Sequence, residues 1–435
     1  MSDARPEGLF SPLKIRNFRL LWSGFIASQI GDMVQILAQS WLVVSLTQSA
    51  TRVAAVAFAQ ALPRLAIGLL AGVLVDRFDR RRLLLVTQSL AALQCATFLG
   101  LVLSGLIRYE LVLALAFALG VLDAMSLTAR QALMPTLVPR PMIARAVALQ
   151  ALGVNITQLA GPSLGGVLIG SFGVRGCLAA NLVTFVVLIG NVLAMRLPPA
   201  EAAPPQSLRR ALGEGLGYVR AQPALWVPIA LAYALGALGM PVVRLLPLWA
   251  RVVLSTSGRG YGFLAVASGI GALGASVWVT SRARPRELPR NIAAAGALFS
   301  VGVMAFSQTR QFASSFAVLV LVGGAQMAFR SAVMTMVQMV APDRLRGRII
   351  SALAMDFALW SVGAVVLGVA VDGLARRHAG LGAGVLSEAI PQGARAEGLH
   401  QGLFIAGAGC LVVTLGALKR LRSTRDALER EGSGP

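Results

Sequence analysis

The sequence predicts an all-α membrane protein, and three observations carry this prediction. Of the 435 residues, 56% are apolar and only 13% are charged, whereas a soluble domain carries about 25% charged residues. The mean hydropathy is +0.74. Apolar stretches of roughly 20 residues, the length that crosses a bilayer, recur along the whole chain. The expected surroundings of this chain are therefore lipid.

Twelve predicted spans follow one another, each bounded by charged residues, turn residues or proline. They lie at about 19–46, 52–75, 83–104, 110–135, 146–172, 174–195, 223–250, 260–281, 289–307, 311–340, 349–373 and 401–418. Some exceed the length of one crossing, so we expect these helices to tilt or to project beyond the hydrocarbon. The loop 375–400 holds both histidines with Gly, Pro and charged residues, and we expect it to be irregular.

The basic residues predict the orientation of the spans. With the N-terminus on the cytoplasmic side, 26 of the 39 Lys and Arg residues fall in cytoplasmic segments, nine on the opposite side and four inside spans. Short cytoplasmic loops are enriched in Lys and Arg. Both termini are therefore predicted to be cytoplasmic, and most of the net charge of +21 is an orientation signal.

The chain is predicted to consist of two halves. Residues 197–222 are rich in proline and charge and read as a cytoplasmic linker between six-helix bundles at 1–196 and 223–435. When the two halves are aligned at an offset of 203 residues, Pro139, Arg145 and Gly165 align with Pro342, Arg348 and Gly368. These matches agree with two parallel repeats related about the membrane normal.

Several classes of function are excluded. The two lysines, Lys14 and Lys419, do not lie in a Gly-rich phosphate loop, so no ATP-hydrolysing cassette is encoded. The two histidines and three separated cysteines offer no metal or haem site within the spans. Little charged surface is available for nucleic acid. We expect no enzyme, no cofactor, no resident metal and no nucleic-acid partner.

The first span carries a polar stripe. Ser28, Asp32, Gln35 and Gln39 are spaced by four, three and four residues and share one helical face. A charge in hydrocarbon is costly, so it marks a functional candidate by default. We expect Asp32 and Gln35 to line a water-filled cavity, with Asp32 taking part in proton or substrate coupling. The alternative is a buried acid held by polar neighbours.

Further charges lie in the second and fourth spans. Asp123 and Arg130 are seven residues apart on one face, and Asp123 is a candidate for coupling or for structural pairing. Arg130 is expected to be structural, pairing near Asp76. Arg64 is placed to neutralise Asp32 or Asp123 or to meet an anionic cargo.

The second half has its own charged pair. Arg330 and Asp356 lie at similar depths in neighbouring spans, which predicts a salt bridge. Gln326 is one turn from Arg330 and leaves room for a role in a cavity. Trp360 is placed to contact an apolar substrate, although packing is the alternative.

The segment after the second span is the first of two motifs. It reads Gly72-Val-Leu-Val-Asp76-Arg77-Phe-Asp79-Arg-Arg81-Arg. This closely resembles the signature loop of the major facilitator superfamily, with Asp79 in place of the usual glycine. The resemblance implies a conformational latch of Gly72, Asp76, Arg77 and Arg81 that stabilises the outward-facing state. For the three final arginines, plain cytoplasmic anchoring is the alternative.

The fifth span carries the second motif, Gly161-Pro162-Ser-Leu-Gly165-Gly166. It resembles the antiporter motif of exporting members of the superfamily, except that Thr157 stands where that motif usually shows glycine. A run of small residues with proline also permits close helix packing and a kink, which is the alternative reading.

Shorter matches point to a branch of the superfamily. The segments 17–22, 31–32, 41–44 and 129–139 resemble the drug-efflux branch that includes the enterobactin exporter and macrolide-efflux proteins. The resemblance covers nearly the whole chain and is densest in the first half.

The resemblance implies the major facilitator fold and a proton-coupled secondary exporter in the bacterial inner membrane, working by alternating access. The expected partners are a hydrophobic or amphiphilic small molecule of the drug or siderophore class, protons and membrane lipid, and the chain is expected to be a monomer. Two alternatives stay open: uptake of a small nutrient or metal complex, and a non-transporting scaffold or sensor.

Overall fold

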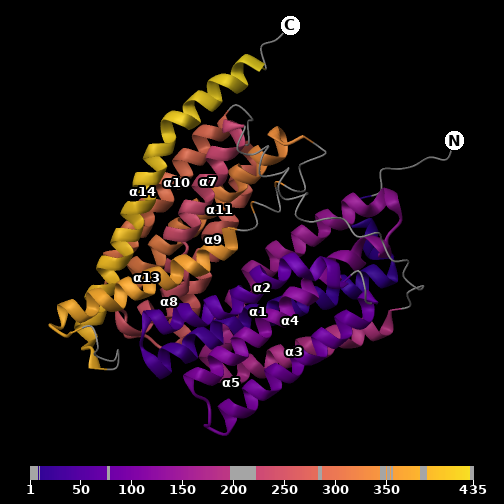
Figure 1. The fold of residues 1–435 in the computed structure, drawn as a ribbon, viewed down its shortest axis with the longest axis horizontal. Helices are drawn as coiled ribbons and strands as arrows, with labels where there is room; N and C mark the ends of the chain where they lie inside the picture. Colours follow the sequence, from indigo (N-terminus) through magenta and orange to yellow (C-terminus); the bar gives the residue numbers. More distant parts are fainter. Residues whose placement is uncertain are drawn as a thin grey trace. The chain divides into compact units, whose positions relative to one another are not determined.

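The computed structural model describes residues 10–75, 79–195, 222–282, 287–342, 356–382 and 389–431, together with 8, 349 and 353. Within these residues the secondary structure is helical, without a strand (Figure 1). The helices are, in chain order, η1 Ser11–Lys14, α1 Arg16–Thr47, α2 Ala50–Val75, α3 Arg80–Leu103, α4 Tyr109–Leu133, η2 Met134–Leu137, η3 Arg140–Met142, α5 Ile143–Ala194, α7 Pro223–Leu238, α8 Pro241–Val252, α9 Gly258–Arg282, α10 Leu288–Ser307, α11 Phe312–Val340, α13 Asp356–His378 and α14 Gln392–Glu431.

Two compact units divide the chain. The N-terminal unit comprises Met1–Leu42 and Ala59–Gln206, and the C-terminal unit comprises Val43–Phe58 and Ser207–Pro435. The end of α1, the start of α2 and the turn between them are therefore part of the C-terminal unit.

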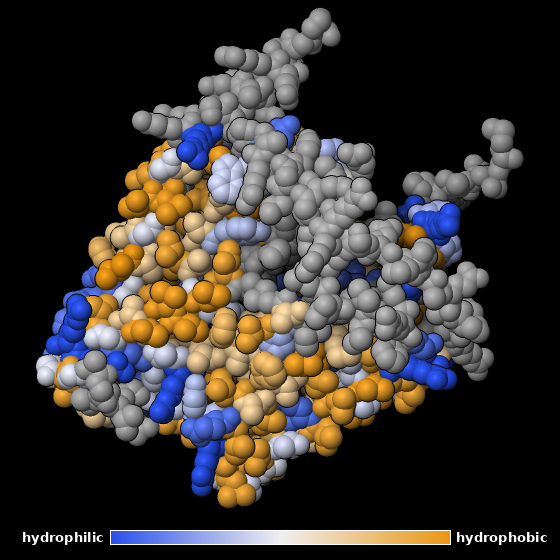
Figure 2. All heavy atoms as spheres, in the orientation of Figure 1, coloured by the Kyte–Doolittle hydropathy of each residue, from blue (hydrophilic) through white to orange (hydrophobic). Residues whose placement is uncertain are grey.

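The surface is that of a membrane protein. In the part of the chain that the structure describes, nine helical segments are long and apolar enough to cross a bilayer. Large hydrophobic side chains such as Leu93, Phe172 and Val412 are more than 60% exposed. Hydrophobic residues cover broad areas of the face seen in Figure 2. This apolar surface confirms an all-helical, multi-pass membrane protein.

Glycine and proline set the ends of two helical segments. The expected spans 146–172 and 174–195 both lie in α5, where the backbone leaves helical geometry at Gly173 with φ 65° and ψ −165°. Glycine adopts this conformation without the steric cost that a side chain brings. The expected span 223–250 contains α7 and α8, and Pro241 begins α8 at a position where its missing N–H is tolerated.

The loop predicted at 375–400 is more regular than the sequence suggested. Helix α13 continues to His378 and α14 already begins at Gln392. His400 is buried, and its ring lies 4.9 Å from that of Trp249. The prediction of an irregular, hydrophilic site for His400 was wrong, because His400 lies within helix α14 and its ring packs against Trp249.

The core of the N-terminal unit packs α1, α3, α4 and α5. Phe18 and Leu21 of α1 meet Leu84 of α3 and Leu188 of α5, all at most 2% exposed. Close approaches at glycine fix the spacing between helices. At Gly120 on α4, a Cβ atom would lie 2.2 Å from the backbone oxygen of Gln60 on α2.

In the C-terminal unit, α10 and α14 lie side by side, as do α9 and α11 (Figure 1). The start of α2 is held by Asp372 of α13. Its carboxylate accepts hydrogen bonds from the Ser49 hydroxyl at 2.7 Å and from the backbone amides of Ala50 at 3.1 Å and Thr51 at 3.0 Å. These bonds satisfy amides at the first turn of α2, which have no partner within the helix.

Candidate functional site

Four charged side chains meet in the N-terminal unit, where those of Arg64 and Asp123 are 44% and 20% exposed. Asp32 of α1 interacts electrostatically with Arg64 of α2 and with Asp123 and Arg130 of α4. The guanidinium of Arg64 donates a hydrogen bond to the carboxylate of Asp123. With both acids ionised, the formal charge of this group is zero. We call these four residues the charged cluster.

Asp32 has the least satisfied carboxylate of the cluster. Its Oδ1 atom is buried and has no hydrogen-bond partner among the residues that the structure describes. A buried oxygen acceptor without a donor is unfavourable, and a carboxylate oxygen in that position gains from taking up a proton or from a ligand that donates to it.

The polar stripe of α1 contacts the second part of α5. Gln35 is fully buried, and its Oε1 atom accepts a hydrogen bond of 2.7 Å from Asn181. The Thr184 hydroxyl donates to the side-chain Oδ1 atom of Asn181 at 2.9 Å. At Gly31 a Cβ atom would lie 2.1 Å from that same oxygen, so glycine allows the two helices to meet. Asn181 is also a neighbour of the Asp32 carboxylate.

The sequence alone does not single out Asn181 and Thr184. The signal available was a polar pair within the apolar span 174–195, but the distance of 146 residues between Gln35 and Asn181 hides their contact.

Arg130 is held against an aromatic ring. Its guanidinium carbon lies 3.7 Å from the ring centroid of Phe25 on α1. A guanidinium stacked on an aromatic face keeps its charge while its hydrogen-bonding edge stays available. The predicted partner of Arg130, Asp76, lies outside the described residues.

The motif in α5 packs on α1 beside Asp32. At Gly161 a Cβ atom would lie 2.4 Å from Cβ of Met33, and at Gly165 it would lie 3.3 Å from Leu37. Gly166 is also buried, and Pro162 lies within the helix. The small residues of the motif therefore bring α5 against the helix that carries Asp32.

Part of the predicted latch falls within the described structure. Gly72 belongs to α2, while Asp76 and Arg77 lie outside the described residues. Arg81 donates to the backbone oxygens of Val192 at 3.1 Å and Leu193 at 2.8 Å, at the end of α5. Asp79 caps α3 by accepting a hydrogen bond of 2.7 Å from the amide of Arg82.

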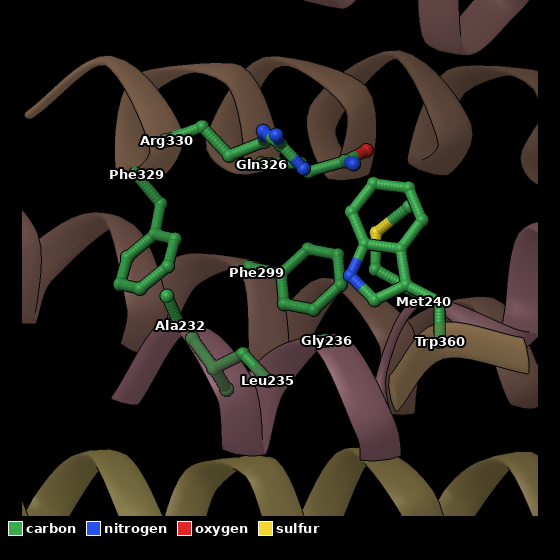
Figure 3. Close-up of a pocket in the computed structure, with 9 residues that line it drawn as sticks. All are labelled: Ala232, Leu235, Gly236, Met240, Phe299, Gln326, Phe329, Arg330 and Trp360. Carbon is green, nitrogen blue, oxygen red and sulfur yellow. The ribbon is translucent and has the colours of Figure 1, made fainter. Parts of the chain in front are cut away.

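The C-terminal unit contains a pocket around Arg330 (Figure 3). The guanidinium carbon of Arg330 lies 5.0 Å from the ring centroid of Trp360 on α13. Gln326 lines the same pocket one turn away on α11. Asp356 begins α13, but its side chain is outside the described part, so its ion pair with Arg330 stays a prediction.

The described residues contain no group of three or more His, Cys, Asp or Glu side chains arranged to hold a metal ion.

Compensating charges within the spans of a multi-pass helical protein are typical of membrane transporters. The chain matches the family described as transmembrane secretion effector over residues 7–392. It belongs to this family of the major facilitator superfamily, and it is a transporter rather than an enzyme.

Its relatives include efflux proteins. The multidrug efflux pump Tap of Mycobacterium tuberculosis is 27% identical over 391 residues, which cover 86% of this chain and 90% of Tap. The enterobactin exporter EntS of Escherichia coli is 28% identical over 382 residues, covering 84% of each chain.

Solved structures show the same fold. A bacterial homologue of the human lysosomal transporter Spinster, in an inward-facing and unoccupied conformation, matches with a TM-score of 0.74, at 17% identity, over 95% of this chain and 98% of that one. A bacterial homologue of the iron transporter ferroportin, in an inward-facing state, matches with a TM-score of 0.64, at 17% identity, over 93% and 98%.

Proposed function

We propose that this chain is a proton-coupled secondary exporter of a hydrophobic or amphiphilic small molecule of the drug or siderophore class, working by alternating access. The names of its relatives support the efflux direction and the cargo class. The observation that carries the proton coupling is the buried, unpartnered Oδ1 atom of Asp32 within the charged cluster.

Protonation of Asp32 changes the charge of the cluster. The groups within electrostatic range of this carboxylate are Arg64, Asp123 and Arg130, with the thiol of Cys95 on α3. A proton on Asp32 takes the cluster from formally neutral to +1. In a poorly solvated interior, that change alters the relative stability of conformations that expose the cluster differently.

In the proposed cycle, this change couples the movement of protons to the movement of cargo. A ligand shifts a two-state equilibrium only through its different affinity for the two states. In the proposed cycle, the proton favours one state and the cargo the other, so inward proton movement drives outward movement of the cargo. Gln35 and Asn181 position α1 and α5 around the carboxylate. The antiporter-like motif, Gly161 with Pro162, Gly165 and Gly166, keeps α5 against α1.

The proposal includes a full topology. We place twelve spans in two six-helix bundles, at 1–196 and 223–435, joined by the linker 197–222, with both termini in the cytoplasm of a bacterium and the protein acting as a monomer in the inner membrane. The latch of Gly72, Asp76, Arg77 and Arg81 belongs to this proposal, as do the roles of Arg330 and Asp356 as cavity residues.

The test is transport by the purified protein in liposomes with an imposed pH gradient. A panel of fluorescent dyes, antibiotics and a siderophore is offered inside the vesicles, and export is expected to depend on the gradient for at least one compound. Absence of gradient-driven movement of every compound would refute the proposal. Accumulation in the opposite direction would support the uptake alternative instead.

A further inference from the structure

A groove at one end of the C-terminal unit is large enough for an organic ligand. It lies between the turn that joins α10 to α11 and the beginning of α14, and its volume is about 500 Å³, within the range of about 300–1,000 Å³ for small-molecule sites. Its lining includes Arg310, Glu397, His400, Gln401, Phe404 and Ile405. We call it the α14 groove.

The α14 groove lies at the boundary between hydrocarbon and water. Arg310 stands in the short turn between two candidate spans, Leu288–Ser307 and Phe312–Val340. Glu397 lies near the start of a third, Gln392–Leu418. Charged side chains at the ends of spans lie at the depth of the lipid headgroups. A headgroup is therefore within reach of this groove.

One wall of the groove is fixed by His400. The Nδ1 atom of its ring bonds to the backbone oxygen of Ser307 at the end of α10, and Nδ1 is the donor, because a carbonyl oxygen only accepts. The ring also packs edge-on against Trp249, with 4.9 Å between the ring centroids. These contacts hold the beginning of α14 against α10, so the groove is part of the folded unit.

The two charged side chains of the groove are available to a ligand. A nitrogen of Arg310 lies 3.8 Å from a carboxylate oxygen of Glu397, longer than the limit of about 3.2 Å for a hydrogen bond. Neither side chain has a hydrogen-bond partner among the residues that the structure describes. They are 76% and 43% exposed. The groove therefore presents cationic N–H donors next to anionic oxygen acceptors.

The α14 side of the groove changes from charged to apolar along the helix. Glu397, Gln401 and Ile405 are spaced by four residues and share one helical face. Phe404 stands next to Ile405, and these two side chains are 40% and 60% exposed within a candidate span. A phospholipid has the same order of groups: a charged headgroup, polar ester linkages and apolar chains. The groove is therefore matched along its length to a lipid molecule.

The pair of opposite charges selects among headgroups. In phosphatidylethanolamine an anionic phosphate and a primary ammonium are joined by an ethylene bridge, so Arg310 and Glu397 can both form charge-assisted hydrogen bonds with it. Phosphatidylglycerol supplies no cation for Glu397 and places its phosphate beside a like charge. Phosphatidylcholine carries a quaternary ammonium without an N–H donor, so it cannot hydrogen-bond to the carboxylate.

We propose that the α14 groove binds one phosphatidylethanolamine molecule. Its phosphate contacts Arg310, its ammonium contacts Glu397, and its ester groups lie at Gln401 with an acyl chain along Phe404 and Ile405. This inference goes beyond the proposed export function and does not depend on it, because the groove would bind the lipid whether or not the chain moves a cargo.

Competition among three phospholipids tests the headgroup assignment. The purified full chain in detergent receives an equimolar mixture of phosphatidylethanolamine, phosphatidylcholine and phosphatidylglycerol with identical acyl chains. Native mass spectrometry then measures the fraction of protein that carries each lipid. We expect phosphatidylethanolamine to bind about tenfold more tightly than the other two, because only it makes a charge-assisted hydrogen bond to Glu397.

Two substitutions separate the contributions of the two charges. Glu397→Gln should weaken binding of phosphatidylethanolamine about tenfold and change binding of phosphatidylcholine by less than about twofold, which also shows that the variant is folded. Arg310→Gln should weaken binding of all three lipids, because each carries a phosphate. Its unfolding temperature should stay at that of the wild type, because this arginine is exposed.

The matched control is the double variant Arg108→Gln/Glu110→Gln, which removes an exposed base and an exposed acid at the start of α4. It should leave all three affinities unchanged. Equal affinities of the three lipids for the wild-type protein, or binding of phosphatidylethanolamine that Glu397→Gln does not weaken, would overturn the inference.

Glycerophosphoethanolamine, which has the headgroup without the chains, separates a lipid from a free zwitterion. Added at the same concentration as the lipids, it should displace little phosphatidylethanolamine, because it lacks the part that lies along the apolar end of the groove. Displacement as complete as that caused by the lipid itself would overturn the assignment to a phospholipid.

Discussion

Arg64 on α2 and Asp123 on α4 form an ion pair beside the point where their helices touch. Gln60 lies one turn before Arg64, and Gly120 lies one turn before Asp123. A Cβ atom on Gly120 would lie 2.2 Å from the backbone oxygen of Gln60. The close approach at glycine therefore sets the distance across which the two charges pair.

Removing both partners of this pair should cost less than the sum of the costs of removing each one alone. Arg64→Gln or Asp123→Asn leaves a charge without its partner, and we expect a loss of about 1–3 kcal/mol in the free energy of unfolding for each. The double variant should lose clearly less than the sum of the two. Thermal unfolding in detergent measures this, and strictly additive losses would contradict the pairing.

Gly161→Ala should disturb the contact between α5 and α1. The added Cβ would lie 2.4 Å from Cβ of Met33, and overpacking of this kind costs about 1–3 kcal/mol. We expect a lower unfolding temperature and slower transport. The control is Gly190→Ala on the same helix, where nothing lies within 4 Å of the added atom. Equal effects of the two substitutions would show that the motif does not act through this contact.

Asp372→Ala should weaken the cap on α2. Its carboxylate accepts three hydrogen bonds from Ser49, Ala50 and Thr51, and loss of a helix cap costs about 0.5–2 kcal/mol. Asp372→Asn keeps one acceptor oxygen and should lose less. The control Glu397→Gln touches a partly exposed carboxylate 3.8 Å from Arg310 and should leave the unfolding temperature nearly unchanged.

Arg81→Ala should destabilise the protein more than Arg82→Ala. Arg81 donates to two backbone oxygens at the end of α5, whereas the Arg82 side chain is exposed. A cation that binds the last carbonyls of a helix contributes about 0.3–1 kcal/mol. Similar unfolding temperatures for the two variants would argue against this role of Arg81.

The fold was predictable from the sequence where one local signal dominates. Apolar stretches bounded by charges fall on the observed helices, and Gly173, between two predicted spans, is where α5 leaves helical geometry. His400 was misplaced because charges around it masked a residue that faces the core.

The site was predictable only in part. Asp32, Arg64 and Asp123 stand out because charges in apolar spans are rare, but their spacing left open whether Arg64 joins Asp32 or Asp123. Asn181 and Thr184 escaped notice because their contacts with α1 depend on tertiary packing at Gly31. Contacts of this kind carry no periodic signal in the sequence.

The most direct test of the central claim is proton release on binding of cargo. With wild-type protein in weakly buffered detergent solution, addition of an exported compound should release protons. The amount released should fall as the pH is raised, because Asp32 then loses its proton before the compound binds. Asp32→Asn should abolish this proton release, while the compound still binds. The control is Glu110→Gln, which alters an exposed acid in the first turn of α4 and should leave the proton release intact. Unchanged proton release in Asp32→Asn would contradict the assignment of proton coupling to Asp32.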